Sequence, residues 1–141
     1  MNGIRSIVSF TVEIPDAEPD RLESSLILIE LVKQAIVSLG AVAENLQPLD
    51  YAQHVNIKLD GKAYYVMCGY VGDELRQWMV SVDRTRGFID TIFGKRGIDD
   101  SDKAITSAIH KALNGRGATN IRWYTVKDWN ANAAEAYSAT P

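Results

Sequence analysis

The sequence predicts an α+β fold, in which a mostly antiparallel sheet packs against two or three helices in a single domain. Three observations support this prediction. The stretch around Asp60-Gly61 alternates and turns like a β-hairpin, two other segments repeat apolar residues at helical spacing, and the chain has 141 residues, a usual length for one domain. We therefore expect residues 1–141 to form one folding unit.

The first predicted strand covers residues 6–14, where apolar and polar residues alternate. Alternation places every second side chain on the same face of a strand. The buried face is expected to carry Val8, Phe10, Val12 and Ile14. Pro15 is expected to end the strand, because proline cannot donate a backbone hydrogen bond.

A helix is predicted over residues 20–39. Asp20 and Glu23 have the spacing of a capping box at its start, and Gly40 stands where helices often end in a left-handed residue. The apolar residues form a broad stripe: Leu22, Leu26, Ile27, Leu28, Ile29, Leu31, Val32, Ala35, Ile36 and Leu39. So broad a stripe indicates packing on more than one neighbour, or an oligomer interface.

A β-hairpin is the clearest local feature of the sequence. Asp60 and Gly61 suit a two-residue turn, in which both residues need positive φ angles. This turn fixes the pairing and predicts one shared face: Val55, Ile57, Leu59, Tyr64, Val66 and Cys68. The second strand is apolar on both sides, which is typical of a central strand. Before the hairpin, residues 41–43 predict a short strand, and Pro48 and Asp50 predict a loop.

A second hairpin turn is predicted around Gly72-Asp73, followed by another strand. The length of its loop decides which face Trp78 occupies. A two-residue turn points Trp78 away from Val66, whereas a three-residue loop puts both side chains on the same face. The sequence leaves these two registers open.

Two helices and one strand are predicted in the C-terminal third. Residues 101–113 carry apolar side chains at helical spacing, and Asn114-Gly115 is expected to stop the helix. Residues 120–126 are rich in strand-forming side chains. A short terminal helix is predicted over residues 129–137. We expect the helices to cover one face of the sheet.

The stretch from Gly87 to Lys103 looks at first like a phosphate-binding loop. Gly87 and Gly94 are too far apart for such a loop, and Arg96 replaces the hydroxyl residue that would reach a metal ion. The residues between the glycines are bulky and apolar. We interpret the stretch as a connector whose tip carries Lys95 and Arg96.

The sequence predicts no catalytic residues, no metal and no cofactor. Cys68 and His54 are expected on opposite faces of the hairpin, so they cannot act together as thiol and base. His110 lies on a helix, and two histidines with one cysteine at unrelated spacings do not make a zinc site. One acidic cluster is interpreted as helix-capping carboxylates: Asp99, Asp100 and Asp102.

Nucleic-acid binding is an alternative that the composition disfavours. Basic residues lie among aromatic ones in the C-terminal half, a combination that can hold phosphates and stack on bases. They are Arg84, Arg86, Lys95, Arg96, Arg116, Arg122 and Lys127. The chain nevertheless carries a net charge of -3 and shows no recognised nucleic-acid-binding motif.

Protein binding is the function that the composition favours. The chain has three tryptophans and six tyrosines, and Trp, Tyr and Arg dominate the energetics of protein interfaces. The predicted partner-binding residues combine the basic connector tip with the C-terminal aromatic segment: Lys95, Arg96, Arg122, Trp123, Tyr124 and Trp129. The first 60 residues carry four basic and nine acidic side chains, so a basic partner is favoured.

We therefore predict a small, non-enzymatic cytoplasmic protein that binds another protein, foremost as an inhibitor or immunity-type partner of a toxin or enzyme. One alternative is a secretion-type chaperone or adaptor, a homodimer through the helix of residues 20–39. Another is an enzyme or small-ligand binder whose site is dispersed along the sequence. One cysteine, Cys68, fits a reducing compartment. No segment offers the roughly 20 apolar residues of a membrane span.

Overall fold

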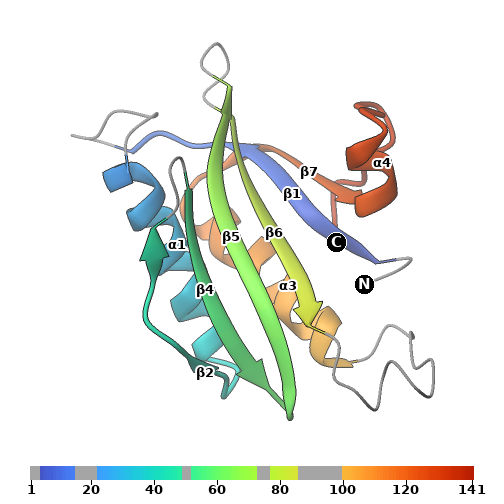
Figure 1. Cartoon of the computed structure of the whole chain (residues 1–141). Helices are drawn as coiled ribbons and strands as arrows, with labels where there is room; N and C mark the ends of the chain where they lie inside the picture. The colour runs from blue at the N-terminus through green and yellow to red at the C-terminus, as the bar shows by residue number, and fades with distance from the viewer. Residues whose placement is uncertain (1–3, 15–21, 49–51, 73–76, 86–99) are drawn as a thin grey trace.

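The structure, a computed structural model, describes residues 4–14, 22–48, 52–72, 77–85 and 100–141. They form one antiparallel sheet in the order β2-β4-β5-β6-β1-β7, with β3 paired to β4 (Figure 1). The strands are β1 Arg5–Thr11, β2 Val42–Ala43, β3 Gln47–Pro48, β4 Ala52–Leu59, β5 Lys62–Gly72, β6 Gln77–Thr85 and β7 Thr119–Thr125. The helices are α1 Leu22–Val37, α3 Asp100–Gly115 and α4 Val126–Asn130. The predicted α+β class is confirmed.

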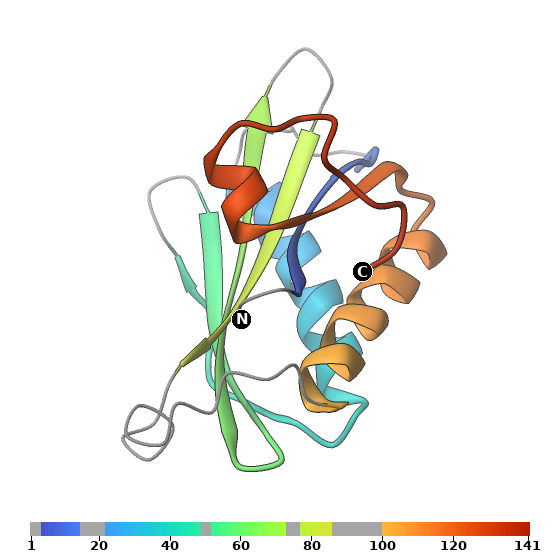
Figure 2. The ribbon, with the colours of Figure 1, turned by 90° about the vertical axis from the view of Figure 1, so that its right-hand side faces the viewer.

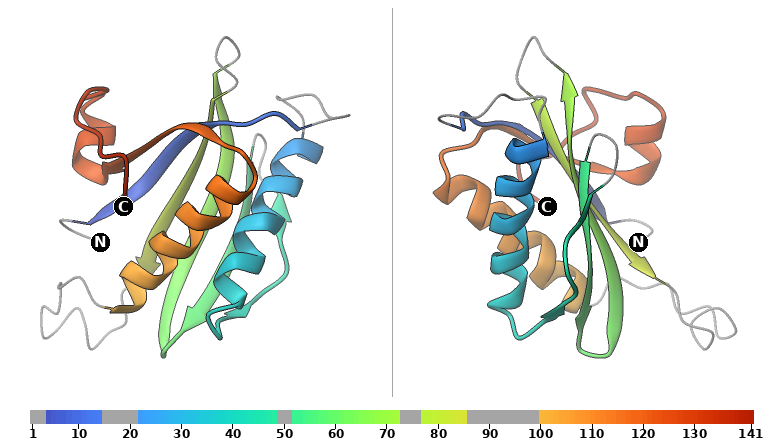
Figure 3. Two further views of the ribbon diagram at one scale, coloured as in Figure 1. Left: turned by 180° about the vertical axis from the view of Figure 1, so that it is seen from behind. Right: turned by 60° about the vertical axis from the view of Figure 1, so that its left-hand side comes forward.

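The two faces of the sheet are covered by different helices. Helices α1 and α3 lie side by side on one face (Figure 3), and the short helix α4 lies on the opposite face (Figure 2). The expectation that all helices share one face is therefore wrong for α4. Among the described residues, α1 and α3 cover one face of the sheet along its length, and this face holds the hydrophobic core.

The first hairpin folds as predicted. Asp60 and Gly61 have φ angles of 52° and 76°, the left-handed values that a two-residue turn between β4 and β5 requires. Val55 pairs with Val66 and Ile57 with Tyr64, and all four side chains are buried. Strand β5 lies between β4 and β6, as its apolar character on both faces predicts.

The second hairpin resolves the register that the sequence leaves open. Val66 pairs with Val82 in β6, and Tyr70 pairs with Trp78. A register shift between Tyr70 and Gly72 accompanies this pairing, so that Trp78 shares the core face with Val66. An irregularity of this kind adds a residue to one strand, and the sequence pattern does not mark its position.

The stripe of α1 that packs on the sheet is narrower than predicted. Leu28, Ile29, Val32 and Ile36 are fully buried, together with the small residues Ser24 and Ser25. Leu26 and Leu39 instead have exposed fractions of 43% and 39%. The helix has the sheet below it and α3 beside it, and its remaining side faces outward (Figure 3). Leu39 follows the end of the helix and lines a groove together with residues of α3.

The C-terminal segment differs from the prediction. Helix α4 begins after Thr125, whose Oγ1 accepts a hydrogen bond from the backbone N–H of Asp128 at 3.1 Å. The helix is therefore placed earlier than residues 129–137, and Asn132, with a φ of 54°, follows its end. Ser138 then exchanges two backbone hydrogen bonds with Trp123, beside the outer edge of β7.

Two small predictions for the first half of the chain have different outcomes. The short strand at residues 41–43 is confirmed as β2. Pro48 is not in a loop but in β3, where it pairs with Gln53 of β4. A proline is tolerated there because β3 is an outer strand. Pro15, Asp20 and Asp50 lie outside the described residues.

Candidate functional site

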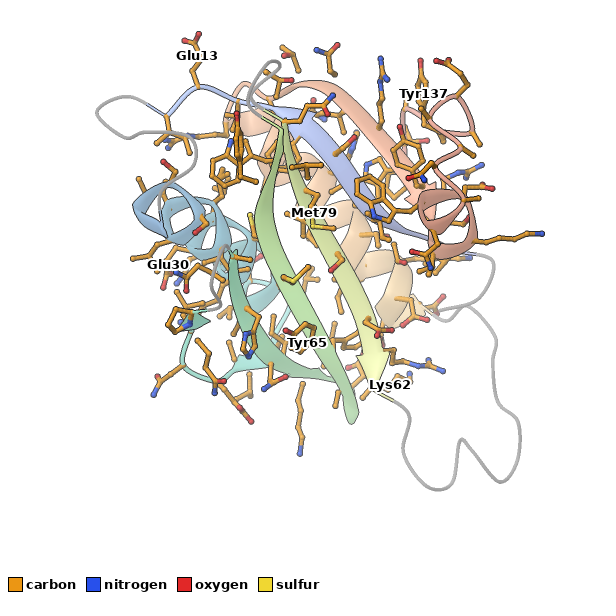
Figure 4. All side chains as sticks on the ribbon, turned by 45° about the horizontal axis from the view of Figure 1, so that its top comes forward. Glu13, Glu30, Lys62, Tyr65, Met79 and Tyr137 are labelled. Carbon is orange, nitrogen blue, oxygen red and sulfur yellow. The ribbon has the colours of Figure 1, made fainter. Side chains whose placement is uncertain are left out.

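The face of the sheet turned away from α1 and α3 carries partly exposed side chains on its central strands. His54 pairs with Met67, and Met67 with Ser81, so all three point to the same side. Asn56 and Tyr65 form the next pair. We call this surface the open face and define it by His54, Asn56, Tyr65, Met67 and Ser81 (Figure 4, where Tyr65 is labelled).

The open face is uncharged in its middle. Its five side chains include no lysine, arginine, aspartate or glutamate. Exposed charges border it: Lys58, Asp83, which pairs with Tyr65, and Glu44, which accepts a hydrogen bond from Asn56 at 3.4 Å. The outward face of an antiparallel sheet is commonly polar. Interface centres are poor in charge and rich in tyrosine and methionine, and the middle of the open face has a composition of this kind.

Two aromatic rings stack on each other at one end of the open face. The imidazole of His54 stacks on Tyr65, with ring centroids 4.8 Å apart and planes inclined by 24°. Nδ1 of His54 is buried and forms no hydrogen bond among the described residues. The ring is therefore held by stacking, not by a polar contact.

An aromatic cluster lies at the other end, where the sheet meets the C-terminal segment. Tyr124 meets Trp129 edge to face at 5.4 Å between centroids, and Tyr137 lies 6.3 Å from Tyr124. The guanidinium carbon of Arg122 lies 4.7 Å from the centre of the Tyr137 ring, a cation–π distance. We call Arg122, Tyr124, Trp129 and Tyr137 the aromatic cluster.

Main-chain contacts hold the aromatic cluster on the sheet. The hydroxyl of Tyr124 donates to the carbonyl of Ala134 at 3.0 Å, which joins β7 to the segment after α4. Arg122 and Tyr124 pair with Ser9 and Ile7 of β1. Ser9 and Ile7 continue across β6 to Met79 and Ser81, so the aromatic cluster and the open face belong to one continuous surface (Figure 4, with Met79 and Tyr137 labelled).

A pocket of about 300 Å³ opens between the aromatic cluster and the sheet. Strands β1, β5, β6 and β7 form its floor and α4 with the following residues forms its wall. Its lining residues are Ser9, Val71, Gln77, Arg122, Tyr124, Asp128, Trp129, Asn132, Ala133 and Ala134. Two of them, Arg122 and Asp128, carry opposite charges.

The structure brings together three of the six residues predicted to bind a partner. Arg122, Tyr124 and Trp129 lie in the aromatic cluster, although the ring of Tyr124 is itself buried, with an exposed fraction of 5%. Lys95 and Arg96 lie outside the described residues. Trp123 points to the other face, is fully buried, and donates from Nε1 to Nδ1 of His110 at 3.0 Å. Its side chain is therefore part of the core and is not available at this surface.

Sequence reasoning missed the open face and Tyr137. The hairpin alternation does place His54, Met67 and Tyr65 on one face, and this was the signal that could have found the surface. Tyr137 gave no signal of its own, because its contact with Arg122 depends on the path of the chain after α4.

A cluster of polar side chains is buried beneath the first turn of α3. Asp102, with an exposed fraction of 2%, accepts a hydrogen bond from the Tyr64 hydroxyl at 2.6 Å and lies 3.6 Å from Nη1 of Arg84. Ser101 donates to Asp60 at 2.9 Å. Asp102, in the first turn of the helix, thus connects α3 to β5 through Tyr64 and to β6 through Arg84. Because the group is buried, we assign it a structural role.

The basic and aromatic residues that would suit nucleic acid are divided by the fold. Arg84 is largely buried and pairs with Asp102, and Trp123 lies in the core. Among the described residues, no three His, Cys, Asp or Glu side chains are grouped to hold a metal ion. Within the same part of the chain, every helix is too short or too polar to cross a membrane.

Cys68 is expected to be unreactive in the folded protein. It is fully buried on the core face, opposite to His54, and burial raises the pKa of its thiol well above its usual range. A disulfide reagent such as DTNB should label the native protein only as fast as it unfolds, and should label it at once in urea. Rapid labelling without denaturant would show that the thiol is accessible.

Comparison with known proteins finds no match among protein families, curated proteins or solved structures.

Proposed function

We propose that this protein binds another protein through the continuous surface formed by the open face and the aromatic cluster. The observation that carries the proposal is the juxtaposition of an uncharged, Tyr- and Met-bearing sheet face with the partly exposed side chains of Arg122 and Trp129, which lie beside the buried ring of Tyr124 at its end. Trp, Tyr and Arg are the side chains that most often dominate binding energy. A rigid sheet presents them without a large loss of conformational freedom on binding.

Within this class, an inhibitor or immunity-type role is the one we favour. The chain carries a net charge of -3, which favours encounter with a basic protein through long-range attraction. An inhibitor needs a stable surface that covers its target and no chemistry of its own. A sheet face bordered by aromatic side chains meets this requirement.

The test is affinity capture from the source cell with matched variants. The wild-type protein should retain one stoichiometric protein, and Trp129→Ala should weaken its binding by tenfold or more, on the order of a hot-spot effect. Lys111→Ala, which removes an exposed charge from α3 on the opposite face, is the control and should bind normally. Equal retention by both variants would place the interface elsewhere, and the absence of any stoichiometric protein would contradict the function.

A dimeric chaperone or adaptor is the second candidate. It is favoured by the neighbouring apolar side chains of Leu26 and Ile27, which are 43% and 38% exposed on α1. Such side chains on an outward helix face suit a helix-to-helix contact between two copies. A mass of two chains in solution, measured by light scattering, would support this role. A monomer would contradict it and favour the inhibitor role.

A further inference from the structure

The pocket beside the aromatic cluster contains polar groups that the fold does not use. Among the described residues, Arg122 and Asp128 form no ion pair, and the side chains of Ser9, Gln77 and Asn132 form no hydrogen bond. Polar side chains that line a cavity without partners remain available to a ligand. One cation and one carboxylate in the same pocket suit a ligand that carries both charges.

Before any ligand arrives, the guanidinium of Arg122 is held in position, and the backbone that carries Asp128 is fixed. Stacking on Tyr137 orients the guanidinium of Arg122, and a guanidinium offers paired donors to a carboxylate. Asp128 stands on α4, whose start is fixed by the hydrogen bond from its own backbone N–H to Thr125. Preorganised groups of this kind lose little freedom on binding.

The size and the remaining walls restrict the ligand further. The volume of about 300 Å³ stands at the lower end of the ~300–1,000 Å³ range of small-molecule pockets, which suits a single amino acid better than a nucleotide. Trp129, Tyr124 and Val71 supply apolar wall, and Gln77 and Asn132 supply amides at the rim.

We propose that this pocket binds a free α-amino acid with an aromatic or aliphatic side chain. The carboxylate of the ligand pairs with Arg122, its ammonium group pairs with Asp128, and its side chain packs against Trp129. A ligand with only one charge would leave the other charged residue of the pocket without a partner. The inference needs the pocket alone and does not depend on the proposed protein-binding function.

Calorimetric titration of the purified full chain with L-phenylalanine, L-tryptophan and L-leucine tests the proposal. At least one should give saturable binding, and N-acetyl-L-phenylalanine amide and phenethylamine, which each lack the carboxylate, should not bind. Arg122→Gln and Asp128→Asn should each weaken binding roughly tenfold, the loss expected when one charged hydrogen-bond partner is removed. Lys127→Gln, a neighbouring exposed cation that does not line the pocket, is the matched control and should bind as the wild type does.

A second measurement follows the wild-type protein alone, by nuclear magnetic resonance. In a ¹H–¹⁵N spectrum, the indole resonance of Trp129 should shift on titration, whereas those of the buried Trp78 and Trp123 should not. The absence of saturable heat with all three amino acids at millimolar concentration would overturn the proposal. Equal binding of the uncharged amide, or a shift confined to Trp78 and Trp123, would overturn it as well.

Discussion

Replacing Asp102 with alanine is expected to lower the free energy of unfolding by about 3–5 kcal/mol. The substitution removes the carboxylate that lies 3.6 Å from Arg84 and accepts the Tyr64 hydroxyl at 2.6 Å. Asp102 has an exposed fraction of 2%, so water does not replace these contacts at the carboxylate site. Breaking one side of a buried ion pair costs far more than removing an exposed charge, because the remaining cation keeps its desolvation penalty.

Asp100→Ala is the matched control for this prediction. Both aspartates lie in the first turn of α3, but Asp100 is exposed. Both substitutions therefore remove the same favourable interaction with the helix dipole, of about 0.3–1 kcal/mol, and their difference isolates the buried cluster. Urea unfolding followed by far-ultraviolet circular dichroism gives both values. Equal midpoints for the two variants would show that the cluster contributes nothing beyond the helix terminus.

Replacing Trp123 with alanine is expected to destabilise the protein by about 3–5 kcal/mol, the usual cost of deleting a large buried aromatic side chain. Trp123 is fully buried, and its Nε1 donates to His110. The variant leaves a large cavity between the sheet and α3, and it leaves Nδ1 of His110 without its donor. Both losses fall in the core, so we expect the whole domain to unfold at lower urea concentration.

Trp129→Ala is the comparison, because it removes the same side chain from the opposite face. Trp129 is only partly buried and contacts Tyr124, so its loss should cost about 1 kcal/mol. The two variants are expected to separate stability from binding, with Trp123→Ala affecting mainly the unfolding midpoint and Trp129→Ala mainly capture of the partner. Equal destabilisation by both would mean that the aromatic cluster belongs to the core.

The elements of the fold could be predicted because their signals are local. The Asp60-Gly61 turn and the alternation around it contain the whole first hairpin, including the separation of Cys68 from His54. The second hairpin could not be settled, because one register shift between Tyr70 and Gly72 exchanges the two faces and leaves no mark in the pattern. Periodicity likewise cannot tell which side of α1 meets the sheet.

The candidate site could be predicted only in the part that is contiguous in sequence. Arg122, Tyr124 and Trp129 stand close together along the chain, and the composition pointed to them. Trp123, between them, turned to the core because successive side chains of a strand point to opposite faces. Asp102 and Tyr64 are 38 residues apart, and the floor of the pocket comes from β1 and β6, so these contacts depend on the sheet order.

Backbone pairing at both edges of the sheet bears on the proposed binding of another protein. On one side the outer strands β2 and β3 pair with β4, and on the other the backbone of Ser138 pairs with Trp123 of β7. Where β4 and β7 are paired in this way they cannot accept an extra strand, and the outer strands β2 and β3 are only two residues long. Short edge strands of this kind give little backbone for strand addition, which is the route by which many unrelated chains associate. The proposed contact with another protein therefore relies on the side chains of a face. Backbone pairing accepts almost any sequence, whereas a side-chain surface discriminates, and a single substitution in it can change the partner.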